Sequence, residues 1–326
     1  MKLKFILPLV LLLTQLTIAQ EGIAVYSDYL SDNYYLLHPS MAGSSNCAKI
    51  RLTSRQQWNS QPESPRLQTL SFNMGVGERS GIGTIVFNDR NGYHSQKGLK
   101  LTYAHHLPLN ESGPELNQLS FGMNAGIIQS SLDETKFSPI FDPITQAGAQ
   151  LKDSYFNLDV GLSYQYNNFY THATIKNIVA NQRQLYTDIE SDNLRKYLFS
   201  TGYIFGETEL LQVEPSVLFQ LVEKTQESFV DINLKLYKKL NEGIVWGGIS
   251  YRRSLDGASY GTNNSQKLQN LIPILGINYK NVMFAYTYTS FVGNIQFASG
   301  GFHQITLGLD IFCKKLRYDC FCPAVN

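Results

Sequence analysis

Hydrophobic and polar residues alternate with a period of two along several stretches of the chain. Between Phe156 and Tyr166 every second side chain is apolar or aromatic, and the residues between them are polar or small. Residues 304–311 repeat this pattern. Successive side chains of a strand point to opposite faces, which an amphipathic helix cannot reproduce, so the pattern predicts β-strands with one apolar and one polar face.

The alternation, together with the turn residues between segments, predicts fourteen strands. They cover residues 48–58, 67–76, 81–88, 98–107, 117–128, 154–166, 168–177, 196–205, 211–221, 228–238, 243–253, 271–279, 282–291 and 302–312. Most are close to the roughly 9–11 residues that a tilted membrane strand needs, whereas globular strands average about 5–6. The sequence therefore predicts an all-β fold, a transmembrane antiparallel β-barrel of about 14 strands, over a soluble β-sandwich with the same alternation.

The predicted connections alternate between short and long. The short ones are 77–80, 167, 206–210, 239–242 and 280–281, and the mostly longer ones are 59–66, 89–97, 129–153, 178–195, 254–270 and 292–301. Outer-membrane barrels have short periplasmic turns and longer external loops. We therefore expect both ends of the barrel sequence in the periplasm, and we expect 129–153 and 178–195 to contact an external partner.

The N-terminus has the three parts of a secretory signal peptide. Lys2 and Lys4 form a basic region, an apolar stretch follows from residue 5 to 13, and Ala19 ends a small-residue cleavage site. The predicted organisation is a signal peptide at 1–19, a periplasmic or lumenal segment at 20–46, the barrel at 47–313 and a periplasmic tail at 314–326. The predicted location is the cell outer membrane.

Four cysteines lie near the two ends of the predicted barrel. Cys47 precedes the first strand, and Cys313, Cys320 and Cys322 follow the last. A closed barrel pairs its first and last strands, and an exported protein meets an oxidising compartment. We therefore hypothesise a disulfide between Cys47 and one of the C-terminal cysteines, while unpaired or locally paired cysteines remain the alternative.

The charges add one candidate site. The formal net charge of +1 argues against a nucleic-acid partner. Charged residues on the polar faces of the strands are candidates for lining the lumen: Lys49, Arg51, Arg55, Asp159, Glu214, Asp231, Lys235 and Asp310. They could form a selectivity path or a partner-binding surface, or they could pair with one another and close the lumen. We favour the paired network, since charges inside a lumen are usually paired.

Motifs for chemistry are missing from the sequence. It contains no HExxH, GxSxG or P-loop motif. The neighbours His105 and His106 would point to opposite faces of a strand and are poor joint metal ligands. Residues 88–92 read as a tight turn rather than a calcium loop. We therefore predict no catalytic, cofactor-binding or metal-binding residues. A barrel hydrolase assembled from distant side chains is the enzymatic alternative.

Short segments spread over nearly the whole mature chain resemble the PorP/SprF family of type IX secretion system membrane proteins. They are YSDY at 26–29, HPSMAG at 38–43, RQQW at 55–58, Pro65, GIG at 81–83, NDRNG at 88–92, LSFG at 119–122, FNLDVG at 156–161, PS at 215–216, DIN at 231–233 and GFHQI at 301–305. The sequence departs from the family pattern at His38, where asparagine is typical, and at Gln304, where glutamate is typical.

This resemblance implies one of two roles in an outer-membrane barrel that performs no catalysis. The protein would help to export and anchor a secreted adhesin through the adhesin's C-terminal domain, which would connect it to gliding motility. Alternatively, it would link to the periplasmic and lipoprotein components of the trans-envelope machinery. Beyond the resemblance, a passive channel or transporter of small hydrophobic substrates remains the competing function. In each case the lipid bilayer is a partner.

Overall fold

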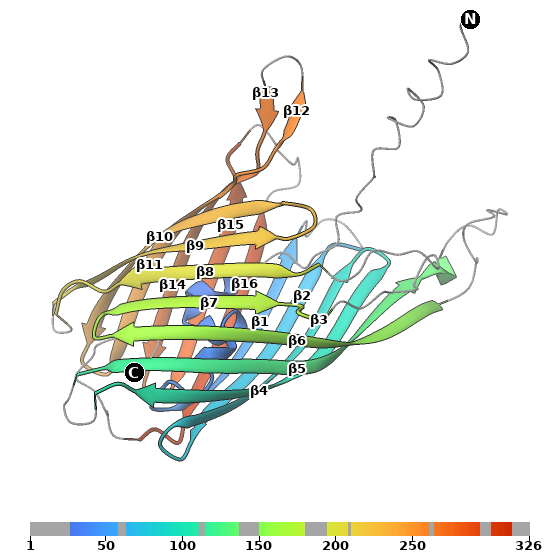
Figure 1. Ribbon diagram of the computed structural model, residues 1–326. Helices are drawn as coiled ribbons and strands as arrows, with labels where there is room; N and C mark the ends of the chain where they lie inside the picture. The colour runs from blue at the N-terminus through green and yellow to red at the C-terminus, as the bar shows by residue number, and fades with distance from the viewer. Residues whose placement is uncertain are drawn as a thin grey trace, which may run out of the picture.

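Fourteen antiparallel strands close into a barrel (Figure 1). The computed structural model describes residues 27–57, 63–110, 115–136, 150–179, 194–207, 210–260, 264–293 and 301–314. The barrel strands are β1 (Ala48–Gln57), β2 (Arg66–Val76), β3 (Ser80–Asn91), β4 (His94–Pro108), β5 (Asn117–Asp133), β6 (Gln150–Tyr166), β7 (Phe169–Lys176), β8 (Lys196–Tyr203), β9 (Gln212–Val222), β10 (Ser228–Leu240), β11 (Gly243–Ser254), β14 (Gln269–Tyr279), β15 (Val282–Phe291) and β16 (Phe302–Ile311). The predicted fold and strand number are confirmed.

The two-residue period separates an apolar exterior from a polar interior. On β2, for example, Leu70 is 44 % exposed on the outside, while Thr69 and Ser71 are buried on the inside. In water such an exterior would be unfavourable, because each exposed side chain leaves apolar area unburied. The same surface is the expected one for a barrel in a hydrocarbon environment.

The barrel closes between its first and last strands. β1 pairs with β16 along its full length, from Ala48 opposite Ile311 to Gln57 opposite Phe302. A disulfide joins Cys47 to Cys313 directly beside this seam, with the two Cα atoms 4.0 Å apart. This is one of the pairings that the sequence left open; Cys320 and Cys322 lie outside the described residues, as does the predicted signal peptide.

The two ends of the barrel differ in their connections. One end, here called the short-turn end, carries both ends of the barrel sequence and the turns that join β6 to β7, β10 to β11 and β14 to β15 with two residues each. The opposite, long-loop end carries the connections between β5 and β6 and between β7 and β8. It also carries a small hairpin, β12 (Ala258–Tyr260) and β13 (Asn264–Gln266), inside a stretch that we expected to be a loop.

Two predicted loops are wrong in their extent. Strands β3 and β4 continue to Asn91 and from His94, so residues 89–97 are mostly strand. Likewise β5 continues to Asp133 and β6 begins at Gln150, which removes both ends of the predicted loop 129–153. Both faces of these segments are rich in polar residues, so the apolar alternation that identifies a membrane strand is lost while the backbone ladder continues.

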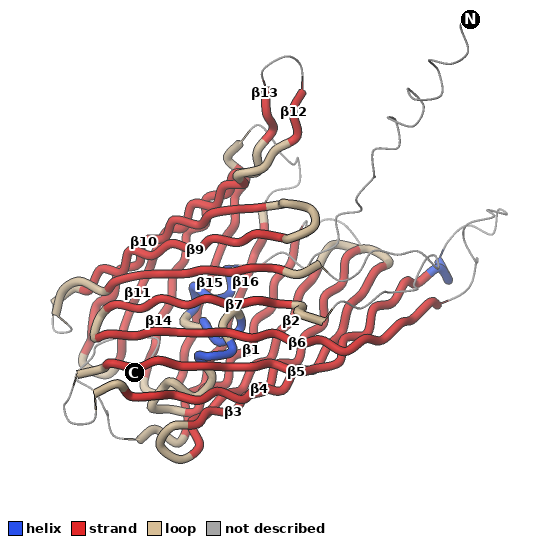
Figure 2. Tube along the Cα trace, in the orientation of Figure 1, coloured by secondary structure: helices blue, strands red, loops and turns tan. Residues whose placement is uncertain are grey.

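The interior of the barrel holds a short N-terminal segment. Residues 27–46 form three 3₁₀ turns, η1 (Ser27–Ser31), η2 (Tyr34–Leu36) and η3 (Pro39–Met41), which appear inside the barrel in Figure 2. A further 3₁₀ turn, η4 (Glu134–Lys136), follows β5. Among the described residues, no helix is long and apolar enough to cross a membrane.

Candidate functional site: the plugged lumen

Residues 27–46, here called the plug, occupy the lumen and hydrogen-bond to many strands. Tyr29 donates to Asp231 near the long-loop end of β10, and the plug then descends until the Ala42 carbonyl meets His106 near the short-turn end of β4. Side-chain bonds and an ion pair connect the plug to nine strands: β1, β2, β4, β6, β7, β8, β9, β10 and β16. The predicted N-terminal segment is therefore lumenal over its described part.

The plug forms only short 3₁₀ turns because its sequence interrupts any longer helix. Pro39 starts η3, where its missing N–H has no helical partner to lose. Asp32, at a φ of 60°, separates η1 from η2. The segment passes so close to the wall that a Cβ on Gly122 would lie 2.2 Å from the Ser40 nitrogen. Glycine is required at this point of β5 because any side chain would push the plug away.

The first charged cluster surrounds Glu214 on β9. The Glu214 carboxylate accepts hydrogen bonds from Tyr34 of the plug at 3.1 Å and from Tyr170 at 2.5 Å, and it also accepts one from Tyr237. Lys235 on β10 lies 3.5 Å away. All of these side chains are buried. A buried carboxylate needs both a cation and hydrogen-bond donors to offset its desolvation, and Glu214 has both.

The second charged cluster surrounds Asp231 on β10. Arg252 of β11 forms a two-pronged ion pair with it, with Nε 2.6 Å from Oδ1 and Nη2 2.7 Å from Oδ2. The Tyr29 hydroxyl of the plug donates to Oδ2 at 2.8 Å. Bidentate arginine–carboxylate pairs are directional as well as strong, so this pair presents a fixed acceptor to the plug.

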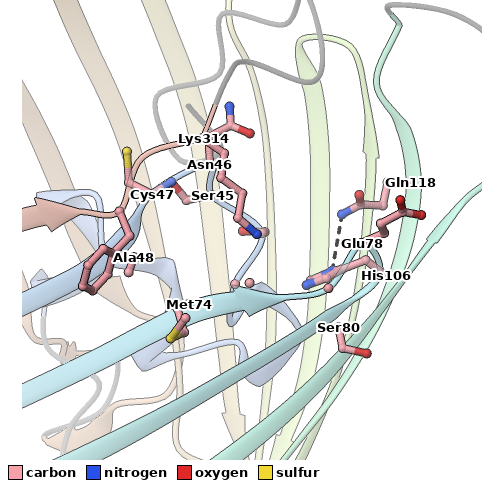
Figure 3. Close-up of a pocket in the computed structure, with 15 residues that line it drawn as sticks. Ser45, Asn46, Cys47, Ala48, Met74, Glu78, Ser80, His106, Gln118 and Lys314 are labelled. Carbon is pink, nitrogen blue, oxygen red and sulfur yellow. Dashed lines mark hydrogen bonds between the residues drawn. The ribbon is translucent and has the colours of Figure 1, made fainter.

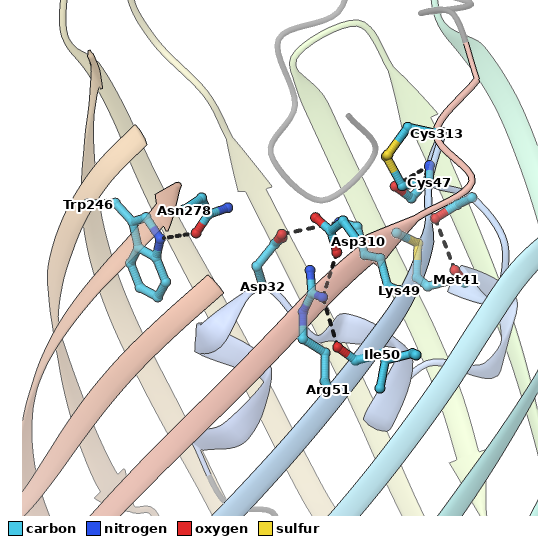
Figure 4. Close-up of polar contacts among 12 residues, drawn as sticks. Asp32, Met41, Cys47, Lys49, Ile50, Arg51, Trp246, Asn278, Asp310 and Cys313 are labelled. Atoms are coloured by element: carbon cyan, nitrogen blue, oxygen red, sulfur yellow. Dashed lines mark hydrogen bonds and ion pairs between the residues drawn. A yellow bond between two sulfur atoms is a disulfide. The ribbon is translucent and has the colours of Figure 1, made fainter. Parts of the chain in front are cut away.

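Two further ion pairs lie near the seam, as Figure 4 shows. Lys49 of β1 contacts Asp32 of the plug at 3.2 Å, and Arg51 contacts Asp310 of β16 at 2.6 Å. The Lys49 pair fastens the plug to the first strand. The Arg51 pair joins the first and last strands, in addition to their backbone ladder.

The third charged cluster lies where β4, β6 and β7 face the plug. Lys100 contacts Asp159 at 2.6 Å, and the backbone N–H of Asn177 donates to the same carboxylate at 2.9 Å. Lys176 donates to the plug carbonyl of Leu36 at 3.1 Å. A charged side chain of the wall therefore holds the backbone of η2 directly.

The histidine of the plug, His38, bonds to two strands of the wall. His38 is fully buried; its ring nitrogens lie 2.8 Å from Thr174 Oγ1 and 2.9 Å from Ser200 Oγ. The pKa of His38 lies well below its ordinary value, mainly because the ring is buried. The nearby His172 and Lys176 lower the pKa further by electrostatic repulsion. A neutral ring can donate from one nitrogen and accept at the other, which suits two hydroxyl partners.

A pocket opens beside the plug at the short-turn end (Figure 3). It has a volume of about 90 Å³ and lies between the plug exit at 43–48, the turn after β2, and Lys314. His106 and Gln118 line its wall, with the Gln118 amide nitrogen 3.4 Å from His106 Nδ1. The His106 Nε2 donates to the Ala42 carbonyl at 3.0 Å, so the proton lies on Nε2 and Nδ1 accepts.

The structure places the candidate lumen charges on the inner face of the barrel. Seven are buried, and Asp310 is partly exposed: Lys49, Arg51, Arg55, Asp159, Glu214, Asp231, Lys235 and Asp310. The guanidinium of Arg55 lies over the Phe302 ring at 4.3 Å rather than in one of the clusters above. The others pair with one another, with the plug, or with charges that the sequence analysis missed, namely Lys100 and Arg252.

The functional residues that the sequence analysis missed differ in how clearly the sequence indicated them. Lys100 has the parity of the inward positions on β4 and could have been found by the same alternation. Arg252 stands beside Arg253, so two adjacent arginines hid which one points inward. The plug tyrosines Tyr29 and Tyr34 had no signal for their partners, which come from strands some 200 residues away in sequence.

The described residues contain no cluster suited to a metal ion. Within those ranges, no three His, Cys, Asp or Glu side chains gather in a way that could hold a metal ion. His105 and His106 face opposite sides of β4, with His106 buried in the lumen. Of the buried carboxylates, Glu214 and Asp231 accept hydrogen bonds from tyrosines of the plug, whereas Asp159 is paired within the wall.

A closed antiparallel barrel with an apolar exterior and a polar, plugged interior defines the class: an outer-membrane β-barrel protein. The chain belongs to the PorP/SprF family of type IX secretion system membrane proteins, whose sequence pattern it matches over residues 18–309. The resemblance in the sequence is thereby confirmed, and the protein is a component of the outer membrane.

Solved structures similar to this chain are outer-membrane barrels. The CymD monoaromatic hydrocarbon channel is 11 % identical over 86 % of this chain and 91 % of that chain, with a TM-score of 0.49. The toluene transporter TodX of P. putida is 10 % identical over 81 % and 88 %, with a TM-score of 0.40. BamA from Haemophilus ducreyi is 9 % identical over 81 % and 70 %, with a TM-score of 0.43. No curated protein matches the chain.

Proposed function

We propose that this barrel is a non-catalytic scaffold of the type IX secretion system that helps to deliver an exported adhesin and anchors it at the cell surface. The observation that carries the proposal is the hairpin of β5 and β6. Strand β6 begins at Gln150, but its pairing with β7 begins only at Val160. On the β7 side the hairpin therefore extends beyond the neighbouring strand, while β4 pairs with it as far as Leu132 on the other side. It offers a platform on which a partner can dock.

The orientation of the barrel supports an outside position for this hairpin. Short turns normally lie in the periplasm and long connections outside the cell. By this rule the short-turn end, with the disulfide, is periplasmic, and the β5–β6 hairpin projects outward (Figure 1). An adhesin held there would have its C-terminal domain at the surface.

The plug weighs against the alternative of a passive channel or small-hydrophobic-substrate transporter. Its side chains bond to nine strands and leave the lumen occupied at mid-height. Conduction through the lumen would require these contacts to break. In planar bilayers, we expect the isolated wild-type barrel to show no stable large open state; such a state would favour the channel.

A link to the trans-envelope machinery is the second role within the same family. The polar pocket beside the plug exit at 43–48 would face the periplasm and could receive a periplasmic or lipoprotein component. The two roles differ in what is lost without the protein. Deletion of the gene should abolish surface display of one large protein while other type IX cargo is still exported. Loss of all export would instead favour the machinery role.

A shortened hairpin tests the outer end of the platform, beyond Ser130 and Asp153. Residues 131–152 are replaced by a two-residue Asn-Gly turn, which joins the two strands at a register pair, Ser130 opposite Asp153. The matched control removes the second projecting hairpin, β12–β13, by replacing 257–267 with the same turn. We expect surface display of the adhesin to fall at least tenfold in the first variant only, with both barrels folded and membrane-inserted. Unchanged display in the first variant would refute docking at the outer end of the platform.

A further inference from the structure

The outer face of the barrel carries a group of basic side chains at the long-loop end, over β2, β3 and β4. Arg66, Arg90 and Lys97, here called the basic rim, are all exposed. Arg66 and Arg90 are direct cross-strand partners, and Lys97 lies opposite Asn88, one outward position below Arg90. The alternation of β2 places Arg66 on the same side as Leu70, which faces outward.

The basic rim lies directly above the apolar exterior. Leu70, Val86 and Leu99 form a row of register partners on the same three strands, and they are 44 %, 45 % and 49 % exposed. The next outward residues toward the long-loop end are Gln68 and Asn88, which hydrogen-bond at 3.5 Å. The surface therefore changes from hydrocarbon-facing to cationic within two outward positions, which is the change expected where acyl chains end and headgroups begin.

The rim has an excess of positive charge. Like charges directly opposite each other in a sheet are destabilising, and Arg66 opposite Arg90 is such a pair. Glu63 forms an ion pair with Arg90, so one carboxylate stands against three cations among the described residues of this patch. A bound anion would relieve the remaining repulsion.

The opposite wall provides a contrast at the same end. Arg253 on β11 also points outward, but its register partners are Val230 and Gln269, both uncharged. Arg253 is therefore a single outward cation, whereas the basic rim brings three together on adjacent strands. The clustering, rather than the presence of arginine, distinguishes β2–β4.

We infer that the basic rim binds the phosphorylated headgroup of a glycolipid in the outer leaflet of the membrane. Arginine forks match phosphate oxygens two at a time, and lysine adds a point charge. The exposed Leu70, Val86 and Leu99 would contact the acyl chains of the same molecule, which favours a lipid over free phosphate. The inference uses the outward orientation of the long-loop end, and it goes beyond the proposed anchoring of an adhesin.

The test measures lipid binding to the full chain purified in detergent. Diphosphorylated lipid A and its dephosphorylated form are titrated separately, and bound lipid is counted by native mass spectrometry. Near an anionic headgroup each Lys or Arg contributes about a fivefold change in affinity, so replacing all three by glutamine should weaken binding about 100-fold. The matched control, Arg253→Gln with Lys238→Gln, removes two outward cations that are not clustered and should bind within about threefold of wild type.

Specificity and folding are checked in the same experiment. Wild type should prefer the diphosphorylated lipid by at least tenfold, and raising the salt concentration should reduce that preference. Heat-modified mobility in gels shows which variants are folded; if the triple variant is not, the single variant Lys97→Gln should still weaken binding about fivefold. The inference is overturned if wild type binds both lipids equally, or if folded rim variants bind as tightly as wild type.

Discussion

Removing the carboxylate of Glu214 tests whether the plug depends on the charged clusters of the wall. Glu214→Gln leaves the Lys235 ammonium buried, and the carboxylate that stood 3.5 Å away is gone. It also leaves three tyrosine hydroxyls with a weaker acceptor. Breaking a buried ion pair from one side costs about 3–5 kcal/mol, so we expect the free energy of unfolding to fall by about that amount.

The companion variants separate the ion pair from the hydrogen bonds. Lys235→Met leaves Glu214 with its three tyrosine donors, so its cost should be smaller, about 1–3 kcal/mol. The double variant should cost less than the sum of the singles by at least about 1 kcal/mol, because no buried charge is left without its partner. Lys238→Met, an exposed lysine on the outer face of the same strand, is the control and should change stability by less than about 0.5 kcal/mol.

Urea unfolding of the full chain in lipid vesicles measures these differences. Trp246 is buried, and its ring centroid lies 5.5 Å from Lys235 Nζ. Its fluorescence therefore reports on this part of the barrel. The reasoning would be refuted if Glu214→Gln unfolded within about 1 kcal/mol of wild type, or if the two single effects simply added. Either result would mean that the cluster is solvated rather than a buried, mutually dependent network.

Three further outcomes follow from the structure. Cys47→Ser with Cys313→Ser opens a loop of 266 residues, and the chain-entropy relation gives a loss of about 5.6 kcal/mol in the free energy of unfolding. The same urea assay measures this loss, and unchanged stability would contradict a stabilising disulfide. Gly122→Val should displace the plug and raise conductance in planar bilayers. The control Gly247→Ala should not, because its Cβ would meet a flexible leucine side chain. A Gly122→Val barrel that does not conduct would contradict this prediction. Folding lowers the pKa of His38, so its contribution to stability is fully present above pH about 6.5 and decreases as the pH falls. The variant His38→Asn should therefore lose less stability than wild type between pH 7.5 and 5.5. Equal losses would show that His38 does not cause the pH dependence.

The barrel itself could be predicted from the sequence because lipid imposes a strong pattern. A strand such as β16 must place apolar side chains at every second position, as Ile305, Leu307 and Leu309 do. Above the membrane this requirement ends. Residues 129–133 and 150–153 were therefore expected to be loop, although the ladder between β5 and β6 continues through them.

The contacts in the lumen were predictable only in part. The alternation along a strand indicates which side chains point inward, but not which residues they contact. The inward direction of Glu214 and Asp231 follows from alternation on β9 and β10. Their contacts with Tyr34 and Tyr29 depend on the path of the plug, and that path is set by tertiary packing over 180 and 202 residues of separation. No local pattern in the sequence encodes such distances.

The disulfide at the seam has a consequence for the order of assembly. Cys47 and Cys313 come from opposite ends of the barrel sequence, and they meet only when β16 lies beside β1. Native oxidation therefore cannot precede the arrival of the last strand, and once it has occurred the barrel is a covalent ring of protein. A ring of this kind cannot open along the full length of the seam between β1 and β16 while the bond is intact. The bond thus marks a completed barrel, and complete separation of its first and last strands requires reduction first.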